Sequence, residues 1–419
     1  MLLTVDIGTS SFKSTLWDYK GNRLSFCSIP LHISISNGSV QEANPAIWLR
    51  AFEESCRKIL KDCGCEQLKK IEALVISGNG PSLVPILGEP TAEKELNVPA
   101  LNARLWLDRR AEKYQDAVKE VMGGFVDAGF FLPKVMYLKN EEKEAYNKIK
   151  TFLGCPEYLA YALTGCAKTV FPSEGFDRWF WNDDVLKKLD LDASKFPDFI
   201  RPGEPFGELS HFAAELFGFK EKIPVISGGP DFYAAILGSG VTEPGQALDR
   251  TGSSEGINLC TDKQINIEKY LSYKHPIKPY WNLSAVISRS GIAIENECKR
   301  LGVNNFDEFI SLADKNCEEI EKSARKILEN ICFQIKEIIL KMENENVKFN
   351  ELRVTGGLSG CDLLNQIKAN ITGKKIITLQ FKEAELLGCA IIGCCFLGKY
   401  TSYTEASSAM VKIKKSYEP

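Results

Sequence analysis

Asp6 and the small residues close behind it are the first candidates for chemistry in this sequence. Asp6 ends a strand-like run and is followed by Gly8-Thr9-Ser10-Ser11 and then by Lys13. A turn of this composition exposes backbone N–H groups and hydroxyls, which are the donors that cradle phosphate oxygens, and Lys13 would add a positive charge. A carboxylate at a strand end can also hold a divalent cation through water. An ordinary hairpin with a polar corner has the same composition, so both interpretations stay open.

Two later segments also place glycines directly after a strand. Gly252, Ser253 and Ser254 lie in DRTGSSEG, and Gly356 and Gly357 lie between a strand and a helix in RVTGGLSGCDLLNQ. The second arrangement aims helix N–H groups at an anion, or lets a backbone approach a flat ligand. The chain has no GxxxxGK[ST] segment and no GxGxxG after its first strand, which excludes a P-loop enzyme and argues against dinucleotide binding.

The segment ISGGPDFYAAILGSG carries the sharpest signal. Asp231 follows a strand and two glycines and begins an apolar helix, where the helix dipole favours the ionised carboxylate. An ionised aspartate beside a surface bared by glycines could accept a proton from a hydroxyl. Asp231 as a plain N-cap is the alternative, and the two roles are compatible because a cap can also face a cleft.

The elements that must position these residues alternate between strands and helices in both halves of the chain. Strand-like runs are expected at 2–8, 12–18, 23–31, 71–80, 223–229, 246–254, 282–288, 351–357 and 375–379. Helical patterns cover most of 103–165, then 306–338, 361–373 and 383–400. This alternation predicts two α/β domains, 1–241 and 242–419, joined at the turn-rich segment VTEPG.

Bulk composition favours a soluble, cytoplasmic protein with a sizeable core. The 419 residues carry a net charge of −3, which gives no overall attraction to nucleic acid or an anionic membrane. No apolar stretch is long enough to span a bilayer, and the start lacks the basic region of a secretory signal. The 14 cysteines include no CxxC pair and are expected to be reduced, and only three histidines argue against a His/Cys metal site.

Five segments together resemble the FGGY family of carbohydrate kinases, which includes xylulose, glycerol and related sugar and polyol kinases. They are DIGTSSFKSTLWD, ARLWLDRRA, GGPDFYAAILGSG, TGSSEG and LRVTGGLSGCDLLNQIKANITG, in the order and spacing of the family. The resemblance implies an α/β fold of the actin/sugar kinase/Hsp70 type, with two ribonuclease-H-like domains and an interdomain cleft. It also implies a xylulose kinase-like enzyme that uses ATP and Mg²⁺ to phosphorylate a small sugar or polyol. The oligomeric state stays open, with a homodimer among the alternatives.

The resemblance also implies roles for individual residues. Asp231 would be the general base and Asp6 the carboxylate associated with Mg²⁺. The expected phosphate- and ATP-binding residues are Thr9, Ser10, Lys13, Gly252, Ser253, Ser254, Gly291, Glu295, Gly356, Gly357 and Ser359. The expected substrate-binding residues are Asn79, Gly80, Trp106, Asp108 and Arg110. The last three match the family's Trp-x-Asp-x-Arg, whereas on composition alone they read as a polar surface turn anchored by a tryptophan.

Three departures from the family pattern leave the acceptor's identity open. The segment NGPS at 79–82 stands where xylulose kinases usually carry Gly-Gln-Met-His-Gly, so Asn79, Pro81 and Ser82 replace residues that touch the sugar. The segment CAKTVFPSEGFDRWFW at 166–181 lacks the family's acid and adds aromatic residues. A block near 305–317 in the C-terminal domain is missing. A non-catalytic sugar- or nucleotide-binding protein on the same fold is the alternative to a kinase.

Overall fold

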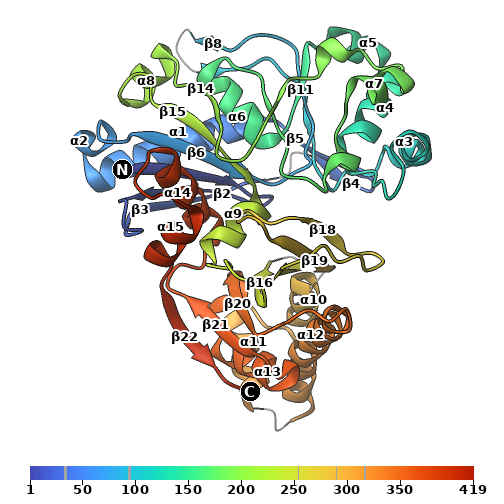
Figure 1. The fold of residues 1–419 in the computed structure, drawn as a ribbon, viewed down its shortest axis with the longest axis vertical. Coiled ribbons are helices and arrows are strands. Elements are labelled where there is room, and N and C mark those ends of the chain that lie inside the picture. The colour runs from blue at the N-terminus through green and yellow to red at the C-terminus, as the bar shows by residue number, and fades with distance from the viewer. Residues whose placement is uncertain (33–34, 93–95, 253, 289, 316–317) are drawn as a thin grey trace. The chain divides into compact units, whose positions relative to one another are not determined.

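The computed structural model describes residues 1–32, 35–92, 96–252, 254–288, 290–315 and 318–419 (Figure 1). The chain divides into two compact units, Met1–Ala234 with Gly388–Ser402, and Ala235–Leu387 with Tyr403–Pro419. The return of Gly388–Ser402 to the first unit is a feature that a single boundary near residue 241 does not describe. Two helices contain the divisions and are therefore shared, α9 (Asp231–Gly238) and α14 (Ala384–Phe396).

The first unit is built on a six-stranded mixed sheet in the order β14-β15-β6-β1-β2-β3. Its strands are β1 (Leu2–Ile7), β2 (Ser11–Trp17), β3 (Arg23–Pro30), β6 (Ala73–Gly78), β14 (Pro205–Glu208) and β15 (Pro224–Pro230). β1, β2 and β3 are antiparallel neighbours, whereas β1, β6 and β15 run parallel. The carboxyl ends of the three parallel strands therefore lie at one edge of the sheet.

Shorter elements complete the first unit. The strands are β4 (Ile35–Asn37), β5 (Val40–Ala43), β7 (Val84–Ile86), β8 (Thr91–Ala92), β9 (Leu96–Asn97), β10 (Ala103–Arg104), β11 (Thr151–Leu153), β12 (Thr169–Val170) and β13 (Phe199–Ile200). The helices are α1 (Ala46–Cys63), α2 (Cys65–Leu68), α3 (Gln115–Met122), α4 (Phe131–Glu141), α5 (Lys143–Lys148), α6 (Cys155–Thr164), α7 (Asp183–Lys188) and α8 (His211–Phe217), with 3₁₀ turns η1 (Glu112–Tyr114), η2 (Asp177–Trp179) and η3 (Ala193–Lys195).

Two helices cover one face of this sheet and hold its core. Trp48 of α1 meets Tyr158 of α6 edge to face, with ring centroids 5.9 Å apart. Phe52, one turn further along α1, is fully buried in the same cluster as alternate residues of β1 and β6. Alternate side chains of a strand face opposite sides of a sheet, and all residues of β1 and β6 are buried, so both faces of the sheet are covered at these strands. On the other face, Gly393 of α14 lies against Val75 of β6.

The second unit repeats the same arrangement. Its seven-stranded sheet has the order β18-β19-β17-β16-β20-β21-β22. The strands are β16 (Gln246–Thr251), β17 (Glu255–Thr261), β18 (Leu271–Lys274), β19 (Trp281–Ile287), β20 (Glu351–Gly356), β21 (Lys375–Leu379) and β22 (Ile413–Tyr417). β16, β17 and β19 are antiparallel neighbours, whereas β16, β20 and β21 run parallel. Without β14 in the first sheet, and without β18 and β22 in the second, each sheet has three antiparallel strands followed by two parallel ones. This is the ribonuclease-H-like order that the fold prediction required.

Helices of the second unit are α10 (Ser290–Leu301), α11 (Phe306–Lys315), α12 (Glu319–Glu343), α13 (Asp362–Thr372) and α15 (Tyr403–Met410), with the 3₁₀ turn η4 (Gly357–Gly360). The amphipathic pattern over 306–338 contains two of these helices, α11 and α12. A new helix begins after Glu318 because this residue and Glu321 form a capping box. The side chain of each residue accepts a hydrogen bond from the backbone N–H of the other.

Two expectations about the whole chain have structural outcomes. In the described residues, no helix combines the length and apolarity needed to cross a membrane. The 12 cysteines whose state the structure gives are free thiols, as the absence of paired spacing predicted.

Candidate active site

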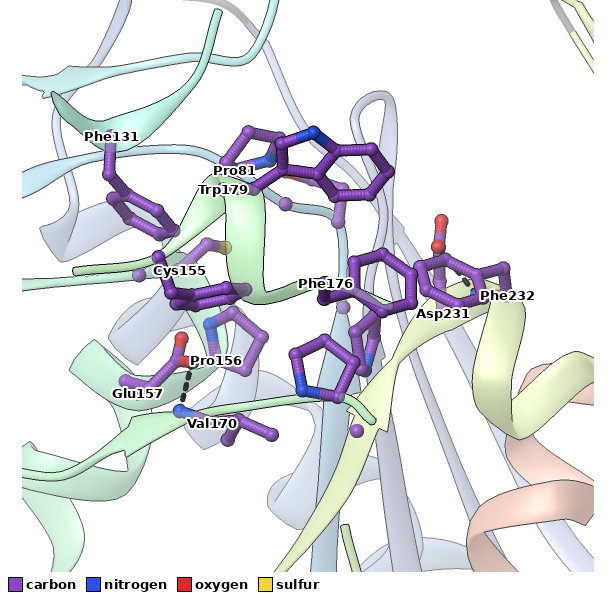
Figure 2. A pocket seen from close by; sticks show the side chains of 18 of the residues that line it. Pro81, Phe131, Cys155, Pro156, Glu157, Val170, Phe176, Trp179, Asp231 and Phe232 are labelled. Atoms are coloured by element: carbon purple, nitrogen blue, oxygen red, sulfur yellow. Dashed lines mark hydrogen bonds between the residues drawn. The ribbon is translucent and has the colours of Figure 1, made fainter. Parts of the chain in front are cut away.

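A cavity of about 160 Å³ lies in the first unit, at the carboxyl ends of β6 and β15 (Figure 2). Three of the predicted site residues line it, Asn79, Gly80 and Asp231. Residues at the starts of α4 and α6 and in the segment 170–180 also line the cavity. Parallel strands of open α/β sheets commonly bind ligands beyond their carboxyl ends, so this position suits a functional site.

Asp231 is held at the cavity by the end of β15 and the start of α9. The pairing of β15 with β6 shifts register between Ser227 and Gly229, and Gly229 has a φ of 75°, which only glycine adopts without strain. Ser77 of β6 fixes this turn, because its hydroxyl donates to the Gly229 carbonyl at 2.8 Å. The Asp231 Oδ1 then accepts the Phe232 N–H at 2.6 Å at the first position of α9. The predicted helix start is confirmed.

The segment 79–82, which departs from the family pattern, forms a loop fixed by its own bonds. The Asn79 side chain donates to the Ile7 carbonyl at 3.0 Å, and its Oδ1 accepts the Ser82 hydroxyl at 3.0 Å. The Pro81 carbonyl accepts from the Lys134 ammonium at 2.8 Å. Both polar ends of the Asn79 amide therefore bind protein groups, and the amide holds the loop against β1.

Lys134 holds this loop in place through its hydrogen bond to the Pro81 carbonyl. It is 1% exposed and also donates to the Arg104 carbonyl at 3.2 Å. Burial lowers the pKa of Lys134 to about 7, although nearby Asp108 opposes this shift. A buried ammonium that donates to two backbone carbonyls is a positioning group for the cavity wall.

Glu157 brings a second carboxyl group to the cavity. It stands in the first turn of α6, is 7% exposed, and accepts the Val170 N–H at 3.2 Å (Figure 2). Burial raises the pKa of Glu157 to about 7, although hydrogen bonds from backbone N–H groups partly offset this effect. Its carboxyl group is therefore close to half protonated at neutral pH.

Aromatic rings form most of the remaining wall. The ring-bearing residues that line the cavity are Phe130, Phe131, Phe176, Trp179, Phe180 and Phe232. Four of these rings contact one another in series, with centroids 5.3 Å apart for Phe130 and Trp179, 4.7 Å for Trp179 and Phe176, and 5.5 Å for Phe176 and Phe232. The other two, Phe131 and Phe180, form a pair with centroids 6.1 Å apart. We call these six residues the aromatic wall. It ends beside Asp231.

The turn after β1 lies close to this cavity, because Asn79 lines both this cavity and a smaller one beside the turn. Asp6 is 5% exposed and is paired across the sheet with Lys13 of β2, while the Gly8 N–H donates to the Ser11 carbonyl at 2.9 Å and closes the predicted turn. The Trp106 indole N–H donates to the Thr9 hydroxyl at 3.0 Å.

A second, smaller cavity of about 10 Å³ links these groups to the first. Thr9, Asn79 and Trp106 all line it, and Asn79 also lines the larger cavity. The structure thus brings together the β1–β2 turn, the altered loop and the first residue of the Trp-x-Asp-x-Arg segment. Ser10 is exposed at the same turn.

Asp108 and Arg110 do not line either of these cavities and instead bind each other. The Asp108 carboxylate accepts from the Gln41 N–H at 2.9 Å and from two nitrogens of the Arg110 guanidinium at 2.8–3.2 Å. Arg110 also pairs with Glu42 at 2.5 Å. Burial alone would raise the pKa of Asp108, but these hydrogen bonds and the guanidinium charge hold it below its ordinary value. Their assignment to sugar binding stays a prediction.

Most of the predicted nucleotide residues of the second unit lie in two adjoining loops. The β16–β17 turn, with Gly252 and Ser254, adjoins Gly356, because Thr251 is paired with Gly356 and its hydroxyl accepts the Leu358 N–H at 3.0 Å. The Ser359 hydroxyl donates to the Gly356 carbonyl at 2.8 Å and closes the loop that follows β20.

Two further predicted nucleotide residues lie on a different element of the second unit. Gly291 and Glu295 stand on α10, and no described hydrogen bond or ion pair links Glu295 to the two loops. Ser253 lies outside the described residues. The structure therefore brings together five of the eight residues predicted for the nucleotide in the second unit.

The two glycines after β20 differ in what surrounds them. Gly356 has a φ of 85°, and a Cβ there would collide with the Thr251 carbonyl oxygen, so this position requires glycine. A Cβ on Gly357 would meet no atom within 4 Å. The Gly357 backbone therefore faces open space, as a surface that a ligand approaches must.

A buried ion cluster lies beneath the β16–β17 turn. Lys368 of α13 pairs with Asp249 of β16 and lies 3.9 Å from a carboxylate oxygen of Glu255 of β17, and all three side chains are fully buried. Burial and the Asp249 charge raise the pKa of Glu255, although Lys368 opposes them. We call these three residues the second-unit ion cluster.

The sequence did not identify Glu157 or the aromatic wall as parts of the site. The available signal was the departure over 166–181, where aromatic residues replace the family's usual run. The sequence alone gives that departure no role, and the structure shows that Phe176, Trp179 and Phe180 from this segment line the cavity that contains Asp231.

The strand order of both units defines the fold class as that of sugar kinases and actin, and comparison with known proteins identifies the family. The model for the N-terminal domain of the FGGY family of carbohydrate kinases matches residues 1–238, and the model for the C-terminal domain matches residues 309–396. The chain therefore belongs to the FGGY family of carbohydrate kinases. It is accordingly an enzyme that transfers phosphate from ATP to a hydroxyl of a sugar or polyol.

Individual relatives agree with this assignment. Xylulose kinase from Staphylococcus xylosus is 25% identical over 477 residues, covering 100% of this chain and 95% of the relative. Gluconokinase from Bacillus licheniformis is 20% identical, covering 97% of this chain and 89% of the relative. Among solved structures, xylulose kinase from Lactobacillus acidophilus has a TM-score of 0.83 at 18% identity, covering 100% of this chain and 94% of the other. Glycerol kinase from Plasmodium falciparum has a TM-score of 0.81 at 16% identity, covering 100% and 93%. These structural likenesses show the fold.

Proposed function

We propose that the first-unit cavity holds the acceptor and that Asp231 is the general base of the phosphoryl transfer. The observation that carries this proposal is the position of Asp231, which lines the cavity at the first residue of α9. A carboxylate in this position can take the proton of an acceptor hydroxyl. The hydroxyl oxygen then forms a bond to the γ-phosphorus as the bond from that phosphorus to the β-phosphate oxygen breaks, which releases ADP.

The β1–β2 turn is suited to the transferred phosphate. Its Gly8-Thr9-Ser10-Ser11 backbone and Lys13 provide N–H donors, hydroxyls and a charge. Mg²⁺ needs only one or two protein carboxylates when water and phosphate oxygens complete its shell, and the buried Asp6 at the end of β1 fits that need. Bound there, the ion would neutralise charge on the phosphates.

The second unit would bind the nucleotide. Gly252, Ser254, Gly356, Gly357 and Ser359 occupy two adjoining loops, and the open space over Gly357 permits close approach of a flat base or ribose. Ser253, Gly291 and Glu295 keep this role by resemblance alone. A cytoplasmic location and a homodimer stay predictions.

D-Xylulose is the first acceptor to test, because relatives along the full length of this chain are named xylulose kinases. The test is a coupled ADP-release assay with D-xylulose, glycerol, D-gluconate and further ketoses and polyols. Asp231→Asn should lower turnover by about 10²–10⁴, the usual contribution of a general base, and leave ATP binding intact. Asp116→Asn, at an exposed position of α3, is the matched control and should behave as wild type. Near-normal turnover of Asp231→Asn would remove Asp231 from this role.

A further inference from the structure

We propose that the preferred acceptor is an uncharged sugar or polyol that carries a hydrocarbon substituent, such as an alkyl chain or an aromatic ring. The proposal rests on the proposed function of the cavity and specifies its substrate class. Three observations carry it: the aromatic wall, the small number of polar side chains that remain available, and the charge of the lining residues.

The aromatic wall offers a continuous apolar surface next to the proposed base. Its rings touch from Phe130 through Trp179 and Phe176 to Phe232, which follows Asp231 directly. Pro81 and three further prolines add to the apolar lining. Rings of this kind bind hydrocarbon faces and other rings, and the free energy gained grows with the apolar area removed from water.

Few lining side chains can serve the hydroxyls of a polyhydroxylated acceptor. Asn79 lines the cavity, but protein groups already take one of its two amide hydrogens and one of the two lone pairs of its oxygen. Glu157 already accepts one backbone N–H, and Asp231 is needed for the reacting hydroxyl. A hydroxyl buried against aromatic rings without a partner loses its hydrogen bonds to water, so a fully hydroxylated chain would bind poorly along this wall.

The acidic residues that line the cavity disfavour the binding of anionic acceptors. Among the described residues that line the cavity, Asp231 and Glu157 are acidic and none is lysine or arginine. An anionic acceptor such as a sugar acid would meet carboxyl groups in a poorly solvated site with no cation to neutralise it. The acceptor is therefore expected to be uncharged.

A series of three-carbon acceptors tests this proposal. Glycerol, 3-methoxypropane-1,2-diol and 3-phenoxypropane-1,2-diol share the diol and differ in apolar area, glycerate adds a charge, and D-xylulose is the reference sugar. We expect kcat/KM to rise from glycerol to the phenoxy compound by about 10-fold or more, as apolar contacts in enzyme pockets commonly provide, and to be lowest for glycerate. Equal or higher kcat/KM for glycerol, D-xylulose or glycerate than for the phenoxy compound would overturn the proposal.

Variants of Trp179 test whether the aromatic wall causes the preference for the phenoxy compound. Trp179→Ala should lower the ratio of kcat/KM for the phenoxy compound to kcat/KM for glycerol by about 5-fold or more. Trp179→Phe, which keeps a ring, should retain most of this ratio. Phe333→Ala, at a 52% exposed position of α12, is the control and should leave the ratio unchanged. An unchanged ratio in a folded Trp179→Ala enzyme would refute the role of the wall.

Binding measurements separate this proposal from the proposed function. If wild-type enzyme phosphorylates no acceptor, the proposed function fails, whereas calorimetric titration still tests the pocket. Tighter binding of the phenoxy compound than of glycerol, weakened by Trp179→Ala, supports the substrate class without turnover. Equal binding of both compounds overturns it.

Discussion

Replacing the buried Glu157 by glutamine should stabilise the first unit relative to wild type at high pH but not at low pH. Glu157 is 7% exposed, and burial is the main cause that raises its pKa from 4.5 to about 7. The folded protein therefore holds this proton up to about pH 7, whereas the unfolded chain releases it near pH 4.5. The stability that the protonated group contributes is complete below pH 4.5 and is lost as the pH rises through about 7.

The size of the effect follows from this difference. The interval from 4.5 to about 7 is 2.5 pH units, and at 1.36 kcal/mol for each unit the loss is about 3 kcal/mol. Glutamine cannot ionise, and its carbonyl oxygen can still accept the Val170 N–H. Its amide nitrogen introduces a buried donor, which costs about 1 kcal/mol if it finds no partner. At pH 5 wild type has already lost about 1 kcal/mol of this stability, so Glu157→Gln should be about as stable as wild type there. At pH 8.5 the variant should be more stable than wild type by about 2 kcal/mol.

Urea unfolding of both proteins at pH 5 and pH 8.5 measures this pH-dependent difference in stability. A chain with two units can unfold in more than one step, so the comparison uses the transition that Glu157→Gln shifts. Glu66→Gln, at a 74% exposed side chain on α2, is the control and should shift no transition differently at the two pH values. If the difference between Glu157→Gln and wild type is the same at both pH values, the carboxyl group is ionised in the folded protein and the reasoning fails.

Three further predictions concern other parts of the site. Gly357→Val should weaken ATP binding in calorimetry without lowering the midpoint temperature of thermal unfolding. Gly356→Ala should lower this midpoint temperature, because its Cβ collides with the backbone. Equal destabilisation by the two variants would contradict this prediction. Asp108→Ala leaves Arg110, whose side chain is 15% exposed, with Glu42 as a remaining partner and should lower the free energy of unfolding by about 1–3 kcal/mol. The sugar KM, measured beside it, should rise far more than the ATP KM if Asp108 also serves the acceptor. Glu255→Gln in the second-unit ion cluster should reduce the loss of stability that wild type shows as the pH rises above 4.5, because the folded pKa of Glu255 is raised, and an unchanged pH dependence would oppose this.

The fold could be predicted from the sequence because its signals are local. The turn after β1, the glycines at the strand ends and the helix start at Asp231 each depend on a few neighbouring residues. The repetition of this pattern in both halves sufficed to predict two α/β units. The return of Gly388–Ser402 to the first unit depends on packing between residues far apart in sequence, such as Gly393 against Val75, and no local pattern reports it.

The site was predictable only in part, for the same reason. Asp231, Asn79 and Gly80 follow from strand ends and from the family pattern, and the structure places all three at one cavity. Glu157 reads in the sequence as an ordinary acid in the first turn of a helix. Its place at the cavity arises because the segment around Val170 folds over α6.

The contrast between the retained and the altered parts of the first unit supports a changed acceptor rather than a lost activity. The groups proposed for proton transfer and phosphate binding keep their local frameworks: Ser77 fixes the turn before Asp231, and the β1–β2 turn closes as predicted. Alterations concentrate at the loop 79–82 and the segment 166–181, which both face the acceptor cavity. A protein that only binds a ligand does not need a proton acceptor, whereas Asp231 lines this cavity at the start of α9. Turnover of an apolar-substituted diol that falls with Asp231→Asn would join these two observations in one experiment.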